Sequence, residues 1–414
     1  MSDWNVIREL ALRVAEIASL PEQQETIRLW KALNRLQPER PMVRVNHVPW
    51  HEMDVDGELT LLTQDPFHRW METELRRTLY AWRHIRVDMV VEPFLRIPKV
   101  IHGVAENLGI EPLEQKIASD EANPIVSHHY SDLFCNDDNL ERIQVPEVWL
   151  DEKATTEREE RACDLLADIL PVRMEGHCPR FTPWDRIIEW RGAQKTLISL
   201  IDEPEFMHRL MRRVTDAYLG RLARLEAQGL LGFDQAIVKN SGAHTDELPR
   251  PGFDLAHPRA CDIWSSGMAQ VFASASPAMH EEFEIQYAIE WYKHFGLNYY
   301  GCCEPLDDRI DLVTRIPRVR KISMSPWTNQ ERGAAKIGDR YVFSRKPNPA
   351  LLVGDGWNPE RVRADLQETL NICRRHGCPC EFILQDVSTV ARHPERLWQW
   401  CDIAMEVAND HDRE

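Results

Sequence analysis

The sequence predicts an α/β fold: a (β/α)₈ TIM barrel with an N-terminal helical extension. Short runs of β-branched, aromatic and other apolar residues recur along the chain, and most of them are separated by stretches with helical periodicity. Strands that alternate with helices are typical of a parallel sheet, and eight of them suggest a closed barrel. The 414 residues do not contradict one barrel, because α/β barrels reach large sizes as single domains.

Two helices are expected before the first strand. Val14 and Ile17 lie on one apolar face, and Trp30 continues such a face beyond a proline that separates the two segments. We therefore assign residues 1–40 to the helical extension and residues 41–414 to the barrel.

The barrel strands follow in order along the chain. They are predicted at 42–48, 88–94, 172–176, 235–240, 297–303, 319–325, 341–344 and 381–387. Helices are predicted between them at 205–228, 280–294 and 359–376. Two connections, near 105–165 and 241–275, are longer than a usual loop and are treated as insertions.

In such a barrel the chemistry is found where the strands end. That rule selects the polar residues His47, Glu92, His177, Asn240, Cys302, Cys303, Glu304, Ser325, Arg345, Lys346 and Asp386. Cys378 and Cys380 precede the last strand, so we expect them at the opposite end of the barrel in a structural role.

The most informative strand end is the segment 297–305, in which an aromatic run is followed by Cys302, Cys303 and Glu304. Adjacent cysteines are poor disulfide partners because the required geometry strains the intervening peptide. The pair therefore indicates a metal site, a nucleophile or a redox function, and the alternative is a cysteine buried as a small apolar residue.

Other strand-end residues leave two interpretations open. Glu92 could be a general acid or base, or it could simply pair with Arg96 or Arg86. His244 lies in a polar loop that could bind a ligand or only face solvent. Arg345 and Lys346 could bind a substrate carboxylate or phosphate, or pair with acidic residues across the barrel mouth.

Charge and segment composition limit the partners. The formal net charge of -17 argues against a nucleic-acid binder or a protein of anionic membranes. The sequence shows no signal segment and no apolar run of membrane-spanning length, so a cytoplasmic location with reduced cysteines is expected.

Three segments in the same order resemble the uroporphyrinogen decarboxylase superfamily over about residues 40–405. Residues 175–182 (EGHCPRFT) resemble the turn after its third strand, and 276–283 (SPAMHEEF) resemble its Ser-Pro helix start. Residues 344–352 (SRKPNPALL) are similar to the segment after its seventh strand. The resemblance implies a barrel that hosts decarboxylases and zinc-dependent corrinoid methyltransferases.

Departures from the decarboxylase pattern favour the methyltransferase branch. Decarboxylases of this superfamily grip substrate carboxylates with an arginine-rich segment after the first strand, whereas residues 46–52 (NHVPWHE) contain no arginine. The methyltransferases place zinc ligands where Cys302 and Cys303 stand, but the histidine of their motif and their last-strand cysteine are missing here. The resemblance thus implies zinc on Cys302, Cys303 and Glu304, with Asp386, His177 or His244 as further candidate ligands.

The predicted function is therefore methyl transfer between a corrinoid and a thiol or other small acceptor. Glu92, His177 and Asp386 are the predicted catalytic residues, and His47, Asn240, His244, Arg345 and Lys346 are predicted to bind substrate. The corrinoid would be a co-substrate or be carried by a partner protein, and a homodimer is a further expected assembly. The alternatives are a cofactor-free decarboxylase or lyase of a small carboxylic acid, and a noncatalytic barrel that binds a corrinoid.

Overall fold

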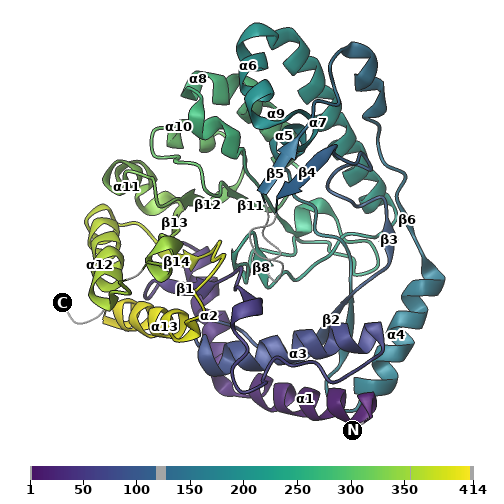
Figure 1. Cartoon of the computed structure of the whole chain (residues 1–414), viewed down its shortest axis with the longest axis vertical. Coiled ribbons are helices and arrows are strands. Elements are labelled where there is room, and N and C mark those ends of the chain that lie inside the picture. Colours follow the sequence, from purple (N-terminus) through teal and green to yellow (C-terminus); the bar gives the residue numbers. More distant parts are fainter. Residues whose placement is uncertain (1, 118–126, 355, 411–414) are drawn as a thin grey trace.

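A curled parallel sheet organises the chain in the computed structural model, which describes residues 2–117, 127–354 and 356–410 (Figure 1). Its strands are β1 (Met42–Val45), β10 (Trp264–Gly267), β11 (Leu297–Tyr300), β12 (Val319–Met324), β13 (Val342–Arg345) and β14 (Cys380–Leu384). Their order in the sheet is β1-β14-β13-β12-β11-β10, and every neighbouring pair is parallel. The polar residues that follow these strands therefore lie at one edge of the sheet.

A second parallel pair continues the curve beyond this sheet. It consists of β2 (Leu95–Pro98) and β7 (Val172–Glu175). Single parallel bridges join His177 to Leu231 and Phe181 to Gly267, which links the region after β7 to β10. Over the described residues these ladders form a mixed α/β, partial barrel, and they do not complete the closed eight-stranded barrel that the sequence predicts.

The predicted strand at 88–94 is wrong, because the strand there is β2 and starts only at Leu95. The Asp88 carboxylate accepts a hydrogen bond from the Val43 backbone N–H at 2.7 Å and pairs with Arg40. The Asp88 side chain thus bonds the Val43 backbone N–H, which a strand next to β1 would otherwise have bonded. The segment that follows Asp88 is irregular chain up to β2.

The predicted strand at 235–240 is also wrong. These residues belong to a short antiparallel hairpin of β8 (Ile237–Val238) and β9 (Ser241–Gly242), with Lys239 and Asn240 in its turn. The wall strand is instead β10, which lies inside the segment 241–275 that is predicted from the sequence to be an insertion. The sequence reveals an apolar run at 235–240. It does not reveal whether this run pairs with a strand of the barrel wall or with the residues that follow it in a hairpin.

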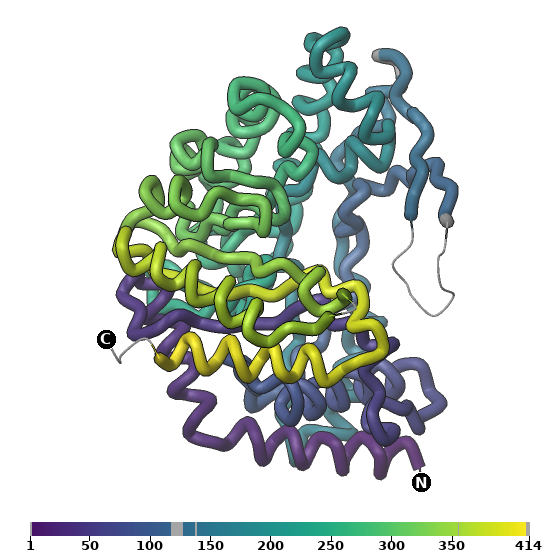
Figure 2. The backbone as a smooth tube through the Cα atoms, turned by 60° about the vertical axis from the view of Figure 1, so that its left-hand side comes forward, coloured from purple at the N-terminus to yellow at the C-terminus, as the bar shows by residue number. Residues whose placement is uncertain are grey.

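Helices cover the outside of the sheet, and the successive strand–helix units stack side by side along it (Figure 2). The helices are α1 (Asp3–Ala18), α2 (Pro21–Asn34), α3 (Pro66–His84), α4 (Glu152–Leu166), α5 (Pro183–Arg191), α6 (Ala193–Asp202), α7 (Pro204–Ala227), α8 (Pro277–His280), α9 (Gln286–Tyr292), α10 (Ile310–Val313), α11 (Gln330–Ile337), α12 (Pro359–His376) and α13 (Pro394–Asn409). The remaining strands are β3 (Ile101–His102), β4 (Glu114–Ile117), β5 (Ser127–Tyr130) and β6 (Trp149–Leu150). None of the described helices combines the length and apolar character needed to cross a bilayer.

Local sequence signals explain the helix ends. Helix α12 starts behind Asn358, whose side chain accepts the Arg361 backbone N–H, and has Pro359 at its first position. It ends at Gly377, which adopts the left-handed conformation that glycine tolerates best. The N-terminal helices α1 and α2 are found where helical spacing predicts them.

The β8–β9 hairpin lies within the curve of the sheet rather than in its wall (Figure 1). Its apolar residues Val238 and Ala243 pack against Trp264, Leu297 and Tyr299, which are buried residues of β10 and β11. Gly242 lies so close to the Trp30 ring that an added Cβ would come within 2.3 Å of it. This contact requires glycine and fixes the base of the hairpin against α2.

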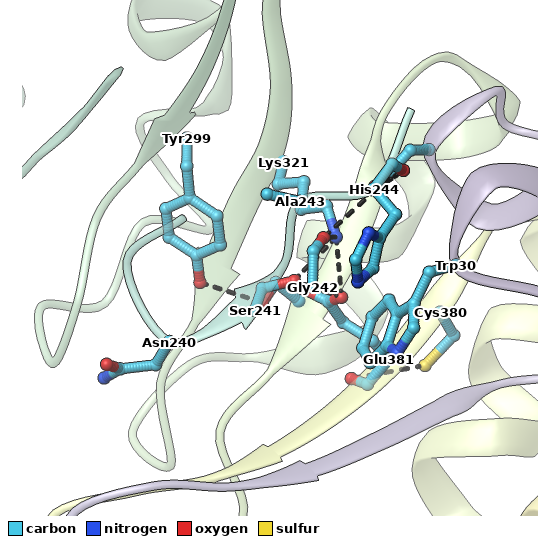
Figure 3. Close-up of polar contacts among 12 residues, drawn as sticks. Trp30, Asn240, Ser241, Gly242, Ala243, His244, Tyr299, Lys321, Cys380 and Glu381 are labelled. Carbon is cyan, nitrogen blue, oxygen red and sulfur yellow. Dashed lines mark hydrogen bonds and ion pairs between the residues drawn. The ribbon is translucent and has the colours of Figure 1, made fainter. Parts of the chain in front are cut away.

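A buried ion pair fastens the same hairpin to the sheet (Figure 3). Lys321 of β12 and Glu381 of β14 are fully buried, and their Nζ and Oε2 atoms are 2.9 Å apart. The Lys321 ammonium also donates to the Ser241 hydroxyl at 2.6 Å and to the Gly242 carbonyl at 3.1 Å, and Ser241 donates to Glu381. One lysine therefore joins two strands and the hairpin.

Replacing Lys321 with Met is expected to lower the free energy of unfolding by about 3–5 kcal/mol, because it leaves the Glu381 carboxylate buried without its cation. Denaturant unfolding followed by tryptophan fluorescence measures the change. The double variant Lys321→Met/Glu381→Leu removes both charges and is expected to recover most of the loss. A single variant as stable as the wild type would contradict this role of the ion pair.

Candidate functional site

The two adjacent thiols stand at the end of β11, inside the curve of the sheet. Gly301, with φ of +97°, turns the chain directly after the strand, and an added Cβ would come within 2.6 Å of Leu306. The turn brings Cys302 Sγ and Cys303 Sγ to 3.5 Å from each other. Cys302 is buried, whereas Cys303 is partly exposed and lines a pocket.

A carboxylate from the end of the last strand joins the thiols. Asp386 follows β14 with φ of +58°, and its Oδ2 lies 3.2 Å from Cys303 Sγ. Its other oxygen, Oδ1, lies 2.8 Å from His47 Nδ1, which comes from the end of β1. Burial by itself would raise the pKa of Asp386, but the hydrogen bonds from His47 and Cys303 hold it at about 2. The carboxylate is therefore ionised at neutral pH.

The thiols share protons unequally. The hydrogen bond with Cys303 lowers the pKa of Cys302 to about 7, against the effect of burial, and the positive charge of Lys239 lowers it further. The same contact raises the pKa of Cys303, so the pair loses one proton readily and holds the second. The pair thus presents one nucleophilic sulfur near neutral pH.

The donor set fits a zinc ion. One ligand atom from each of Cys302, Cys303 and Asp386 lies within 4.8 Å of the other two, and no other group of three such residues in the described chain meets this condition. Two thiolates and a carboxylate are ligands that zinc accepts, and three protein ligands leave the fourth position open, as in catalytic zinc sites. Both cysteines are ligands predicted from the sequence, and Asp386 is a further predicted candidate.

A pocket of about 370 Å³ opens beside the group. Its walls include Cys303, Asp386, Lys346, Asn348 and Trp327, and the Trp327 side chain is exposed on 72% of its surface. A small molecule in this pocket would touch the thiol side of the cluster. An exposed indole at such a rim can cover a bound ligand.

Lys346 is a buried cation in the wall of this pocket. Its Nζ donates to the Tyr299 hydroxyl at 2.6 Å and to the Ser344 hydroxyl at 3.0 Å. Among the described residues no carboxylate bonds this ammonium, and burial lowers the pKa of Lys346 to about 8. A cation with only neutral partners is suited to bind an anionic group of a ligand.

The structure brings together His47, Asn240, Lys346, Cys302, Cys303 and Asp386 of the predicted site residues. It does not bring Glu304 to the thiol sulfurs. The buried Glu304 carboxylate accepts the backbone N–H groups of Cys302, at 2.9 Å, and Ala269, at 3.3 Å. It stabilises the turn that carries the thiols.

Four other predicted residues are not part of the group of Cys302, Cys303 and Asp386 and do not line the pocket beside it. Glu92 pairs with Arg96 and, with His244, lines a separate pocket of about 540 Å³ that α2 also borders. Arg345 donates to the Ser325 carbonyl and pairs with Asp365 of α12. His177 is mostly buried, and this burial together with the nearby arginines lowers its pKa to about 4.

Three residues of the site have no role predicted from the sequence. Gln385 donates from Nε2 to Cys302 Sγ at 3.4 Å and to Asp386 Oδ2 at 2.9 Å. Lys239 contributes its charge from the hairpin turn, and Trp327 forms the rim of the pocket. Gln385 directly precedes Asp386 at a strand end, which was a usable signal. Lys239 gave no such signal, because residues 235–240 are predicted from the sequence to be a strand of the barrel wall.

Comparison with known proteins does not identify a family for this chain. No protein-family model and no curated protein sequence matches this chain. Among solved structures, the chain is similar to a methyltransferase from Methanosarcina mazei, with 15% sequence identity and a TM-score of 0.49, over 92% of this chain and 97% of that one. A likeness of this extent does not assign a function to the chain.

Replacing Lys346 with Met should remove a pH-dependent cost of folding. The pKa of Lys346 is about 8 in the folded chain and 10.5 ordinarily, so between these values the unfolded chain binds more protons and stability rises with pH. Below about pH 8 the cost is fully present, roughly 3 kcal/mol before the lost hydroxyl contacts are subtracted. Lys346→Met is therefore expected to be more stable than wild type near pH 7.

Denaturant unfolding of both proteins at several pH values tests this expectation. The stability difference between Lys346→Met and wild type should shrink as the pH rises from about 8 to about 10. Lys336→Met is a matched control, because Lys336 is paired with Asp311 on the surface. A difference that stays constant over this range would show that the Lys346 ammonium is not strained by burial.

Proposed function

We propose that the chain is a zinc-dependent methyltransferase that moves a methyl group between a corrinoid and a small thiol. The observation that supports it is the convergence of Cys302, Cys303 and Asp386 beside a pocket. A structural role for two adjacent thiols would not require an ionised carboxylate at 3.2 Å from one of them. The resemblance of the sequence to corrinoid methyltransferases is consistent with the same chemistry.

Bound zinc would supply Lewis-acid activation, holding the acceptor sulfur as a thiolate at neutral pH. Cys302, Cys303 and Asp386 would be its protein ligands. His47 and Gln385 hydrogen-bond to the two oxygens of Asp386, so both oxygens have a fixed direction. Lys239 adds positive charge that favours deprotonated sulfur at this site.

The remaining pocket residues would bind the acceptor. Lys346 can pair with an anionic group of a small thiol, and Trp327 can pack over its hydrocarbon part. The sequence shows no corrinoid-binding Asp-x-His-x-x-Gly pattern, so the corrinoid would arrive as a co-substrate or on a partner protein. Docking of such a protein and formation of a homodimer stay predictions.

The decarboxylase alternative finds less support in the geometry. It requires Glu92, His177, Arg345 and Asp386 to act on one substrate, but Glu92 and Arg345 are engaged in ion pairs away from the thiol pocket. Asp386 itself is hydrogen-bonded to His47 and Gln385. An assay that measures carbon dioxide release alongside thiol methylation separates the two activities.

Protein purified without added metal or chelator is expected to carry about one zinc per chain, as a site of three protein ligands predicts. Replacing Cys302 or Cys303 with Ala should remove most of it, because each variant deletes one ligand. Elemental analysis by mass spectrometry measures the ratio. Cys380→Ala is the matched control, since Cys380 starts β14 at the other end of the strand and should retain the metal.

Methyl transfer from methylcobalamin to small thiols tests the reaction itself. Activity should fall when zinc is removed by a chelator and return when zinc is added back. Metal-free protein that methylates thiols at the full rate would end the zinc proposal. Carbon dioxide release without thiol methylation would favour the decarboxylase instead.

A further inference from the structure

A side-chain amide connects the interior hairpin to the thiol cluster. Gln385 has only 2% of its surface exposed and lies between the two. On one side its Oε1 accepts a hydrogen bond from Asn240 Nδ2 at 2.7 Å. On the other side its Nε2 donates to Asp386 Oδ2 at 2.9 Å and to Cys302 Sγ at 3.4 Å.

The chemistry of these partners sets the direction of the amide. The ionised carboxylate of Asp386 only accepts hydrogen bonds, so the group of Gln385 that faces it must be the N–H₂ group. The oxygen of Gln385 then faces Asn240, which must present its own N–H₂ group. If both amides were flipped, the Gln385 oxygen would face the Asp386 carboxylate at 2.9 Å, two acceptors without a proton between them.

Asn240 is held in place from both sides. Its backbone carbonyl accepts a hydrogen bond from Asn46 Nδ2 at 2.6 Å, from the segment after β1. The next residue, Ser241, is bonded to Lys321 and Glu381 (Figure 3). The preceding residue, Lys239, has φ of +54°, which closes the hairpin turn. The Asn240 amide is therefore a fixed donor and not a mobile surface group.

We propose that Asn240 is a positioning residue of the metal centre: it orients the Gln385 amide so that its N–H₂ group faces the Cys302 sulfur and the Asp386 carboxylate. The inference rests on the proposed function, because it treats these residues as zinc ligands. Donors that face metal ligands orient them, and their loss typically lowers metal affinity 10–100-fold. Asn240 acts through Gln385 and touches neither sulfur.

The test compares two substitutions at one position. Asn240→Ala removes the donor, and Gln385 can keep its orientation toward Asp386. Asn240→Asp keeps the shape but offers only acceptor atoms, so the amide must either turn its oxygen toward Asp386 or leave two acceptors facing each other. Competition with a chromophoric chelator is expected to show a zinc affinity 10–100-fold below wild type for Asn240→Asp, in which Gln385 no longer donates to the ligands. The affinity of Asn240→Ala should lie between those of Asn240→Asp and wild type.

Spectra of the cobalt-substituted protein add a readout other than affinity. The thiolate-to-cobalt charge-transfer band should shift in Asn240→Asp, because the hydrogen bond to the Cys302 sulfur is lost. The matched control is Asn329→Asp, which adds the same charge at an exposed helix N-cap where Asp also accepts the Arg332 N–H. It should change neither affinity nor spectrum.

A charge swap tests the direction of the amide without any metal. In Asn240→Asp/Asp386→Asn the carboxylate moves to the other end of the chain of hydrogen bonds. The Gln385 amide can then turn round, donating to the carboxylate at position 240 and accepting from the amide at position 386. The double variant is therefore expected to melt at a higher temperature than Asn240→Asp alone in metal-free protein.

The outcomes separate the two proposals. Wild-type protein that binds no zinc would remove the proposed function, while recovery of stability in the swapped variant would still support the orienting role of Asn240. Zinc binding in Asn240→Asp at least as tight as in Asn240→Ala would overturn the inference. A swapped variant no more stable than Asn240→Asp would overturn it as well.

Discussion

The buried ion pair between Lys321 and Glu381 is the interaction on which the candidate site depends. It spans β12 and β14, and the same ammonium binds Ser241 and Gly242 of the interior hairpin. A buried pair adds little stability when its desolvation is counted, but it strongly disfavours any arrangement that separates the charges. Here the specified arrangement is a hairpin whose turn residue Asn240 bonds Gln385, which in turn donates to the Cys302 sulfur.

The thiol cluster places two negatively charged groups, a carboxylate and a thiolate, next to each other. Asp386 is kept ionised by His47 and Cys303, and one sulfur of the pair is favoured as a thiolate. Two negative groups so close repel each other unless a cation or donors compensate them. Lys239, Gln385 and His47 supply part of that compensation, and a divalent cation would supply the rest.

Lys346 illustrates how such a site differs from the core around it. Lys321 has a carboxylate partner, whereas the equally buried Lys346 is bonded only to hydroxyl groups. Burial of a cation that no carboxylate bonds opposes folding. The negative charges of Glu381 and Cys302 offset only part of this cost, because the pKa of Lys346 is still lowered to about 8. An anionic ligand in the neighbouring pocket would provide the missing charge.

The sequence by itself determined the α/β class, the N-terminal helices, most strand positions and the choice of Cys302, Cys303 and Asp386 as candidate site residues, because periodicity and strand-end position are local properties. It could not determine that residues 235–240 form an interior hairpin, that β10 lies in a supposed insertion, or that Glu304 turns away from the sulfurs. Each of these depends on which distant group takes a given hydrogen bond. Gln385 and Asn240 meet only in the folded chain, where 145 positions of sequence separation are closed by one contact.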